Sequence, residues 1–208
     1  LSESARALVR KAAEESCVLL KNDGILPLKE TAKVAFVGPF VEESEIIGNW
    51  SKKARAGDSV SVKDGVERLL KRAVPSARGC SWKLFDTDES GFDEAEKVCE
   101  DADFIVACVG EYMLNSGEAH SRADIRIPEI QRKFIARLHE LNKPLALVVF
   151  GGRPLAFDGI EELADAILYA WQPGTEGGNA IANLLYGKVN PGGKTVMSFP
   201  RSSGQCPI

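Results

Sequence analysis

The sequence predicts an α/β fold, a three-layer α/β/α sandwich with a mostly parallel sheet, and two observations lead to this class. Strand-like and helix-like segments alternate along the chain, and the strand-like segments are continuous apolar runs such as Asp103 to Val109. Continuous apolar strands indicate burial on both faces, which occurs where helices cover both sides of a parallel sheet. The chain has 208 residues, enough for one buried core, so a single domain over residues 1–208 is expected.

The first elements follow from spacing and turn chemistry. Residues 2–16 place Ala, Leu and Val at helical spacing among Arg, Lys and Glu, which predicts an amphipathic helix with Ser2 or Ser4 as its N-cap. Residues 18–24 predict a short extended piece that ends in a turn with Asn-Asp-Gly chemistry. Residues 33–39 predict a strand that stops at a Gly-Pro pair.

The remaining elements continue the alternation, with apolar runs predicting strands and helical spacing predicting helices. In chain order they are helix 62–73, helix 92–101, strand 103–109, helix 129–141, strand 145–150, short helix 160–163, strand 166–171 and helix 176–186. Functional residues of such folds gather beyond the carboxyl ends of the strands. The long polar loop 48–61 and the segment after strand 103–109 are therefore the places to search.

The charge distribution excludes two classes of partner. Lys and Arg number 26 against 30 Asp and Glu, a formal charge of -4, and no run of basic residues exceeds two. Binding to phosphates requires clustered basic residues, so neither nucleic acid nor an anionic membrane is expected as a partner. The mainly apolar runs 144–150 and 166–171 are far shorter than the roughly 20 residues of a membrane span, so no segment is expected to cross a membrane.

The five cysteines form an odd set without a C-x-x-C pair, which favours reduced thiols. The start of the chain shows no signal-peptide pattern. The compartment stays open, with a cytoplasmic location favoured over a secreted or periplasmic one. The chain begins with Leu inside a helical pattern and ends at residue 208 without a closing element, so we expect a piece of a longer protein.

Several metal-binding and cofactor-binding motifs are incomplete or absent when they are compared with the sequence residue by residue. Asp86 to Gly91 begins like a calcium loop, but Lys97 stands at the twelfth position, where a bidentate Glu is required. The two histidines, His120 and His139, have no cysteine at ligand spacing, which argues against a zinc site. The patterns G-x-S-x-G and G-x-G-x-x-G are absent. No metal ion or cofactor is expected.

Two segments remain as candidate sites. The first follows strand 103–109 and contains two carboxylates, a histidine and an arginine: Glu111, Glu118, His120 and Arg122. A Glu in such a loop can act as a general acid when partial burial raises its pKa, although a solvated polar loop has the same composition. The second is Trp50 in a polar loop, whose ring can stack on a sugar face or anchor its own loop.

Eight motifs occur along the chain in a fixed order. They are ESCVLLKNDG (15–24) with LPL (26–28), KVAFVGP (33–39), GNW (48–50), VGE (109–111), SGE (116–118), GRPL (152–155), WQPGTEGG (171–178) and GKVNPGG (187–193). Each motif alone is weak, but the whole series resembles the second domain of glycoside hydrolase family 3, the β-glucosidase family.

The resemblance implies a six-stranded α/β sandwich packed against a preceding TIM-type barrel, with residues 1–30 as an N-terminal helix and linker from that barrel. Members of this family are exo-acting retaining glycosidases that remove terminal β-linked sugars, usually glucose, through a covalent glycosyl-enzyme. Two carboxylates lying roughly 5 to 5.5 Å apart carry out this reaction. The nucleophile, an Asp, belongs to the barrel, which this chain lacks.

The resemblance also implies a role for each candidate residue. Glu118 is the acid/base, because it lies farther from the strand end than Glu111 and can reach across a domain interface. Trp50 matches a Trp that forms one wall of the aglycone subsite. Arg122 orients the loop or contacts the acid/base through a charge-assisted bond. Glu111 is assigned to the substrate pocket, although its position at the strand end is typical of a structural residue.

The sequence therefore predicts the acid/base-bearing second domain of a retaining β-glucosidase, a glycoside hydrolase. Its expected partners are a β-glucoside or oligosaccharide substrate and the barrel of the same polypeptide. Without the nucleophile the domain alone is expected to be inactive. Two alternatives stay open: a small-molecule-binding or nucleotide-binding α/β domain, and a structural domain of an enzyme whose acid/base lies elsewhere.

Overall fold

The computed structural model describes residues 1–44, 46–51 and 57–206. Its centre is a six-stranded sheet in the order β1-β6-β5-β4-β2-β3, and every neighbouring pair is parallel except β1 and β6. The strands are β1 (Val18–Asn22), β2 (Val34–Val37), β3 (Ser76–Ala77), β4 (Phe104–Gly110), β5 (Leu145–Phe150) and β6 (Ala166–Trp171). This arrangement confirms the predicted α/β class with a mostly parallel sheet.

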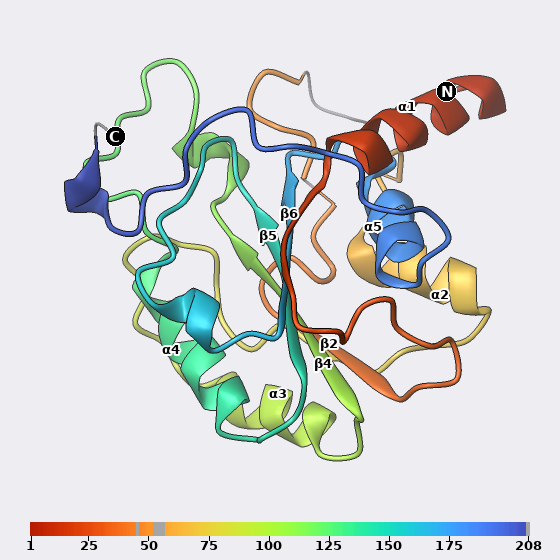
Figure 1. Ribbon diagram of the computed structural model, residues 1–208, viewed down its shortest axis with the longest axis horizontal. Coiled ribbons are helices and arrows are strands. Elements are labelled where there is room, and N and C mark those ends of the chain that lie inside the picture. Colours follow the sequence, from red (N-terminus) through yellow and green to blue (C-terminus); the bar gives the residue numbers. More distant parts are fainter. Residues whose placement is uncertain (45, 52–56, 207–208) are drawn as a thin grey trace.

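Helices cover both faces of the sheet, which makes the three layers seen in Figure 1. One face carries α3 (Phe92–Cys99) and α4 (Glu129–His139), and the other carries α1 (Glu3–Ser16), α2 (Val62–Leu70) and α5 (Gly177–Leu185). Each strand supplies alternate residues to two separate cores. In β4, for example, Ile105 and Ala107 pack on the α3/α4 side, whereas Val106 and Cys108 pack on the α2/α5 side.

The structure matches most of the predicted elements, and the differences have local causes. Strands 145–150 and 166–171 have the predicted bounds. The predicted helix 62–73 ends at Leu70, because Lys71 takes the left-handed conformation with φ 55° and cannot continue the helix. The predicted short helix 160–163 is a single 3-10 turn, η2 (Ile160–Glu162). Strand β3 was not predicted, because two residues carry no periodicity.

The segment 1–30 contributes directly to the fold. Strand β1 pairs antiparallel with β6, with Val18 opposite Tyr169, so this part of the segment lies within the sheet. Helix α1 begins after Ser2, whose side chain caps it by accepting from the amide of Ala5. Its inner side is held by the pair Arg6 Nη1–Glu176 Oε1 at 2.6 Å. A hydrogen bond at 2.6 Å from Asn183 Nδ2 to Glu14 adds to this contact.

Helices α2 and α5 cross in backbone contact at two glycines. A Cβ atom placed on Gly65 would lie 2.2 Å from the carbonyl oxygen of Gly178. A Cβ on Gly178 would in turn lie 1.9 Å from the carbonyl oxygen of Ser61. Only glycine therefore allows these two helices to approach so closely. Among the described residues, no helix has the length and apolar character needed to cross a bilayer.

Candidate functional site

The predicted site residues lie on segments that leave one edge of the sheet. Strands β2, β4, β5 and β6 are parallel, so their carboxyl ends meet there. Trp50 lies in the segment after β2, Glu111 follows β4 directly, and Arg153 and Gln172 come just after β5 and β6. Residues 52–56 of the predicted loop 48–61 lie outside the described residues.

Glu111 is the buried anchor of the loop that follows β4. Its side chain is 0% exposed, and both carboxylate oxygens accept from arginines: Oε1 from Arg122 Nη1 at 2.6 Å and Oε2 from Arg153 Nε at 3.1 Å. Arg122 also donates to the carbonyl of Arg126 at 3.0 Å, and Arg153 donates to the carbonyl of Asn115 at 2.7 Å. This geometry favours a structural role for Glu111 and a loop-orienting role for Arg122.

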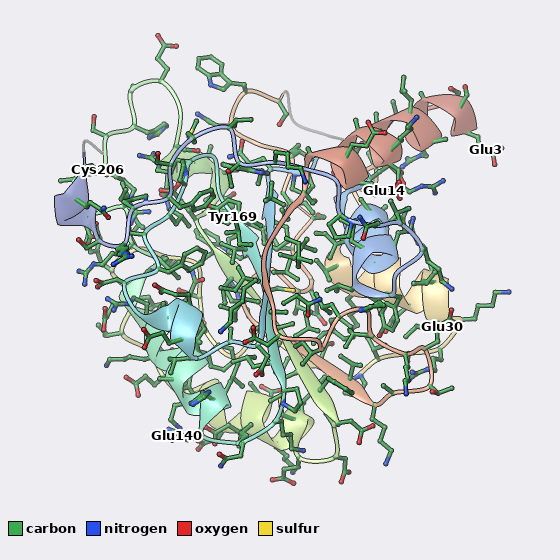
Figure 2. All side chains as sticks on the ribbon, viewed as in Figure 1. Glu3, Glu14, Glu30, Glu140, Tyr169 and Cys206 are labelled. Atoms are coloured by element: carbon green, nitrogen blue, oxygen red, sulfur yellow. The ribbon has the colours of Figure 1, made fainter. Side chains whose placement is uncertain are left out.

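Two further side chains fix the strand ends beneath this loop. The fully buried amide of Gln131, on α4, accepts from the amide of Gly110 at 2.7 Å and donates to its carbonyl at 2.9 Å. The hydroxyl of Tyr169, labelled in Figure 2, donates to the carbonyl of Arg153 at 2.5 Å and accepts from the amide of Leu155 at 3.2 Å. The loop after β4 therefore starts from a rigid support.

Glu118 lies at the exposed end of the same loop. After the 3-10 turn η1 (Met113–Asn115), the chain makes a tight turn in which the amide of His120 donates to the carbonyl of Gly117 at 3.2 Å. Gly117 and Ala119 on either side of Glu118 have φ values of 107° and 62°, so the turn uses the left-handed region twice. The Glu118 carboxylate makes no hydrogen bond or ion pair with the described residues and faces outward.

Trp50 lies beside this turn with 74% of its surface exposed. Its own turn is closed by Ser51, whose amide and hydroxyl donate to the carbonyl of Gly48 at 3.2 and 2.6 Å. A Cβ on Gly117 would lie 3.5 Å from the indole Nε1 of Trp50, so the indole and the Glu118 turn are neighbours. The structure thus brings Trp50 and Glu118 together at the surface, and it places Glu111 and Arg122 underneath.

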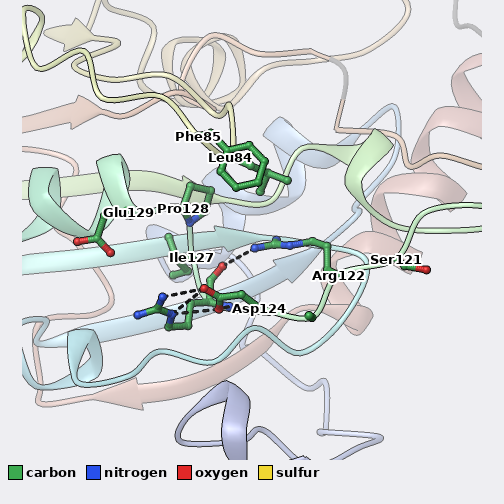
Figure 3. Close-up of a pocket in the computed structure, with 10 residues that line it drawn as sticks. Leu84, Phe85, Ser121, Arg122, Asp124, Ile127, Pro128 and Glu129 are labelled. Atoms are coloured by element: carbon green, nitrogen blue, oxygen red, sulfur yellow. Dashed lines mark hydrogen bonds and ion pairs between the residues drawn. The ribbon is translucent and has the colours of Figure 1, made fainter.

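A cavity lies beside this site and does not contain it. It has a volume of about 620 Å³ and is bounded by Leu84 and Phe85 on one side and by residues 121–124 and 126–129 on the other. Figure 3 shows Arg122 on its wall with the guanidinium turned toward a backbone carbonyl. Neither Trp50 nor Glu118 lines this cavity. In the described part of the chain, the side chains of both Trp50 and Glu118 are exposed.

Sequence reasoning assigned no role to several residues of the site. Arg153, Gln131 and Gln172 support the loops, and Asn49 connects two of them. Arg153 and Gln172 belong to the motifs at 152–155 and 171–178, so their positions were visible although their contacts were not. Gln131 lies in the middle of a helix and carries no comparable signal.

The arrangement combines a solvent-facing carboxyl group with an exposed indole. A carboxyl group can deliver a proton to, or take one from, a group bound on the indole side. An indole face binds the apolar face of a sugar ring. The site therefore suits acid/base chemistry on a carbohydrate, provided that a second surface covers it and supplies any further reacting group.

The chain is similar to known glycoside hydrolases. The model of the glycosyl hydrolase family 3 C-terminal domain matches residues 17–208. The chain is 40% identical to a periplasmic β-glucosidase of Salmonella typhimurium, over 98% of this chain and 29% of that protein. It is 34% identical to a β-xylosidase of Formosa agariphila, over 100% of this chain and 30% of that protein.

Among solved structures, the β-glucosidase from Listeria innocua in complex with isofagomine superposes with a TM-score of 0.94 at 35% identity, over 100% of this chain and 29% of that one. The chain thus spans less than a third of the length of these relatives. Because the family model covers nearly all of the chain and these relatives are glycoside hydrolases, the chain belongs to glycosyl hydrolase family 3, of which it is the C-terminal domain.

Proposed function

We propose that this domain supplies the general acid/base, Glu118, and one wall of the aglycone subsite, Trp50, to an exo-acting retaining β-glucosidase. The observation that carries the proposal is the exposed Glu118 turn beside the exposed indole of Trp50. Glucose is favoured as the terminal sugar because the relative at 40% identity is a β-glucosidase. We propose that the remaining part of the active site, including the nucleophile Asp, lies in an N-terminal barrel of the same polypeptide.

In the first step of the proposed reaction, the nucleophile carboxylate attacks the anomeric carbon and the bond to the aglycone oxygen breaks. Glu118 gives its proton to that oxygen, so the aglycone leaves as a neutral alcohol. In the second step a water molecule attacks the anomeric carbon and gives a proton to Glu118, and the nucleophile carboxylate leaves. One water is consumed, and the sugar is released with its anomeric configuration retained.

The exposure of Trp50 and Glu118 supports the proposal that this domain and the barrel each supply part of the active site. A general acid needs a pKa near the working pH, and partial burial is the usual way to raise the pKa of a Glu. Glu118 is exposed on this chain, so the barrel would enclose it and exclude water from the reacting groups. The chain alone is therefore proposed to be inactive on glycosides.

The experiment uses the full-length enzyme with Glu118→Ala and compares an activated aryl β-glucoside with cellobiose, with and without azide. Loss of the acid should abolish cellobiose turnover and spare the first step on the activated substrate, whose leaving group needs no proton, so that its glycosyl-enzyme forms but is hydrolysed slowly for lack of the base. Azide needs no base to attack the glycosyl-enzyme, so it should restore rate and yield β-glucosyl azide. The matched control is Glu94→Ala, which removes an exposed carboxylate on α3.

Normal turnover of both substrates by the Glu118→Ala enzyme would refute the acid/base assignment and favour a structural role for the domain. Sugar preference is tested separately by comparing aryl β-glucosides with aryl β-xylosides, because one relative is a β-xylosidase. A preference for xylosides would move the proposed substrate to that class and leave the role of Glu118 unchanged.

A further inference from the structure

The Trp50 turn and the Glu118 turn are joined by one hydrogen bond. Asn49 Nδ2 donates to the carbonyl oxygen of Ser116 at 2.8 Å, a contact between residues 67 positions apart in the sequence. The donor directly precedes Trp50, and the acceptor lies two residues before Glu118. A single side chain therefore connects the backbone segments that carry the indole and the carboxylate.

Close packing supports this connection. A Cβ atom on Gly117 would lie 2.3 Å from Asn49 Nδ2, so the amide group lies flat against the glycine that opens the Glu118 turn. Gly117 also has a φ of 107°, a conformation that residues with a side chain rarely adopt. The backbone conformation thus favours glycine between Ser116 and Glu118, and a side chain there would displace the Asn49 amide.

A second brace reaches the same point from the end of β6. Gln172 Nε2 donates to the hydroxyl of Ser116 at 3.3 Å, and Ser116 is buried. A Cβ on Gly48 would lie 2.5 Å from Gln172 Oε1, and a Cβ on Gly152 would lie 2.3 Å from Ser116 Oγ. Gln172 therefore contacts both turns, while Asn49 forms the direct bond between them.

We propose that Asn49 is a positioning residue that holds Trp50 and Glu118 in one fixed arrangement. This inference rests on the proposed function. An aglycone stacked on the indole then has its glycosidic oxygen within reach of the Glu118 carboxyl group. Without the Asn49 bond only the contacts of Gln172 join the two turns, so they are held less firmly and proton delivery to that oxygen becomes less frequent. Misplacing a reacting group by about 1 Å can cost about 100-fold in rate.

A positioning role predicts that the loss depends on the leaving group. Aryl glucosides whose phenols have a low pKa leave without a proton, whereas phenols of high pKa and the sugar of cellobiose need one. Loss of the Asn49 bond should therefore lower kcat/KM by about 10- to 100-fold for cellobiose and by less than about threefold for a dinitrophenyl glucoside. A merely destabilised enzyme would lose the same factor on every substrate.

The test uses the full-length enzyme with Asn49→Asp, which keeps the shape of the side chain and replaces the Nδ2 donor by an oxygen. Asn49→Ala removes the same bond without adding a charge. The matched control is Asn142→Asp, because Asn142 Nδ2 makes an equivalent bond to the carbonyl of Glu140 at 2.9 Å beyond the far end of α4. Active enzyme is counted by trapping with a 2-deoxy-2-fluoroglucoside, so partial misfolding does not affect the rate per active site.

The expected result is a steeper fall of kcat/KM with rising phenol pKa in both Asn49 variants and an unchanged slope in Asn142→Asp. An unchanged slope in Asn49→Ala, or a change confined to Asn49→Asp, would overturn the inference, since the second result reflects the added charge. Failure of the proposed function looks different. In that case the Glu118→Ala enzyme itself turns over cellobiose normally. If azide rescues Glu118→Ala but the Asn49 variants keep the wild-type dependence of kcat/KM on phenol pKa, only the positioning role is overturned.

Discussion

Replacing Glu111 by Gln should destabilise the domain strongly, because this carboxylate is wholly buried between two arginines. Glu111→Gln keeps the size of the side chain but removes the negative charge and turns an amide group toward a guanidinium. Removing one partner of a buried ion pair costs about 3–5 kcal/mol, since the remaining charge stays uncompensated. For a chain of this size the midpoint of thermal unfolding should fall by roughly 6–20 °C.

The assay is urea unfolding of the wild-type chain and its variants, followed by circular dichroism. The chain offers a matched control in Glu96→Gln, because Glu96 Oε1 pairs with Arg137 Nη2 at the same distance of 2.6 Å. Those side chains are 22% and 41% exposed, so that pair should contribute only about 0–1 kcal/mol. Equal losses in the free energy of unfolding for the two variants would refute the argument that burial makes the Glu111 ion pairs strongly stabilising.

Four other predictions concern packing and protonation. In the folded chain only Cys206 should react rapidly with a thiol reagent, because burial raises the pKa of the other four thiols, three of them to about 12. A raised pKa means that the folded state favours the protonated thiols, so these four thiols contribute their full stability below pH 9, the pKa of an ordinary thiol. Above pH 9 the unfolded chain loses thiol protons more readily than the folded chain, so unfolding in urea should become easier as the pH rises. Gly65→Ala should cost about 1–3 kcal/mol by forcing α2 and α5 apart, whereas Gly192→Ala, with open space around it, should be nearly neutral in the same urea assay. Glu176→Gln should cost about 1.5–3 kcal/mol by weakening the bond from Arg6, and it should speed hydrogen exchange in α1 before the sheet is affected.

The elements that were predicted well are those with a local cause. Strands 145–150 and 166–171 are uniform apolar runs with polar or turn residues on both sides, a pattern that predicts a strand buried on both faces. Strand β3 has only two residues and forms by pairing with β2, so no local sequence pattern predicts it. The observed helix ends differ from the predicted ones by a few residues, because capping conformations such as that of Lys71 depend on the path of the chain beyond the helix.

The place of the candidate residues on the fold was predictable, and their contacts were not. The loop after β4 and the Trp50 loop could be placed at one edge of the sheet by the rule for parallel strands. The bond from Asn49 to Ser116 spans 67 residues, and the two arginines on Glu111 come from different loops. Such contacts depend on side-chain orientations that no short sequence window contains.

The pairing of the edge strand β1 with β6 has a consequence for folding during synthesis. Val18 and the residue opposite it, Tyr169, are 151 positions apart (169 − 18), so translation at about 5–20 residues per second leaves β1 without its partner for roughly 8–30 seconds. During that time the apolar run Val18-Leu19-Leu20 is an unpaired strand next to a nascent helix, the kind of segment that aggregates or recruits chaperones. The first strand of this domain to be synthesised is thus among the last to enter the sheet.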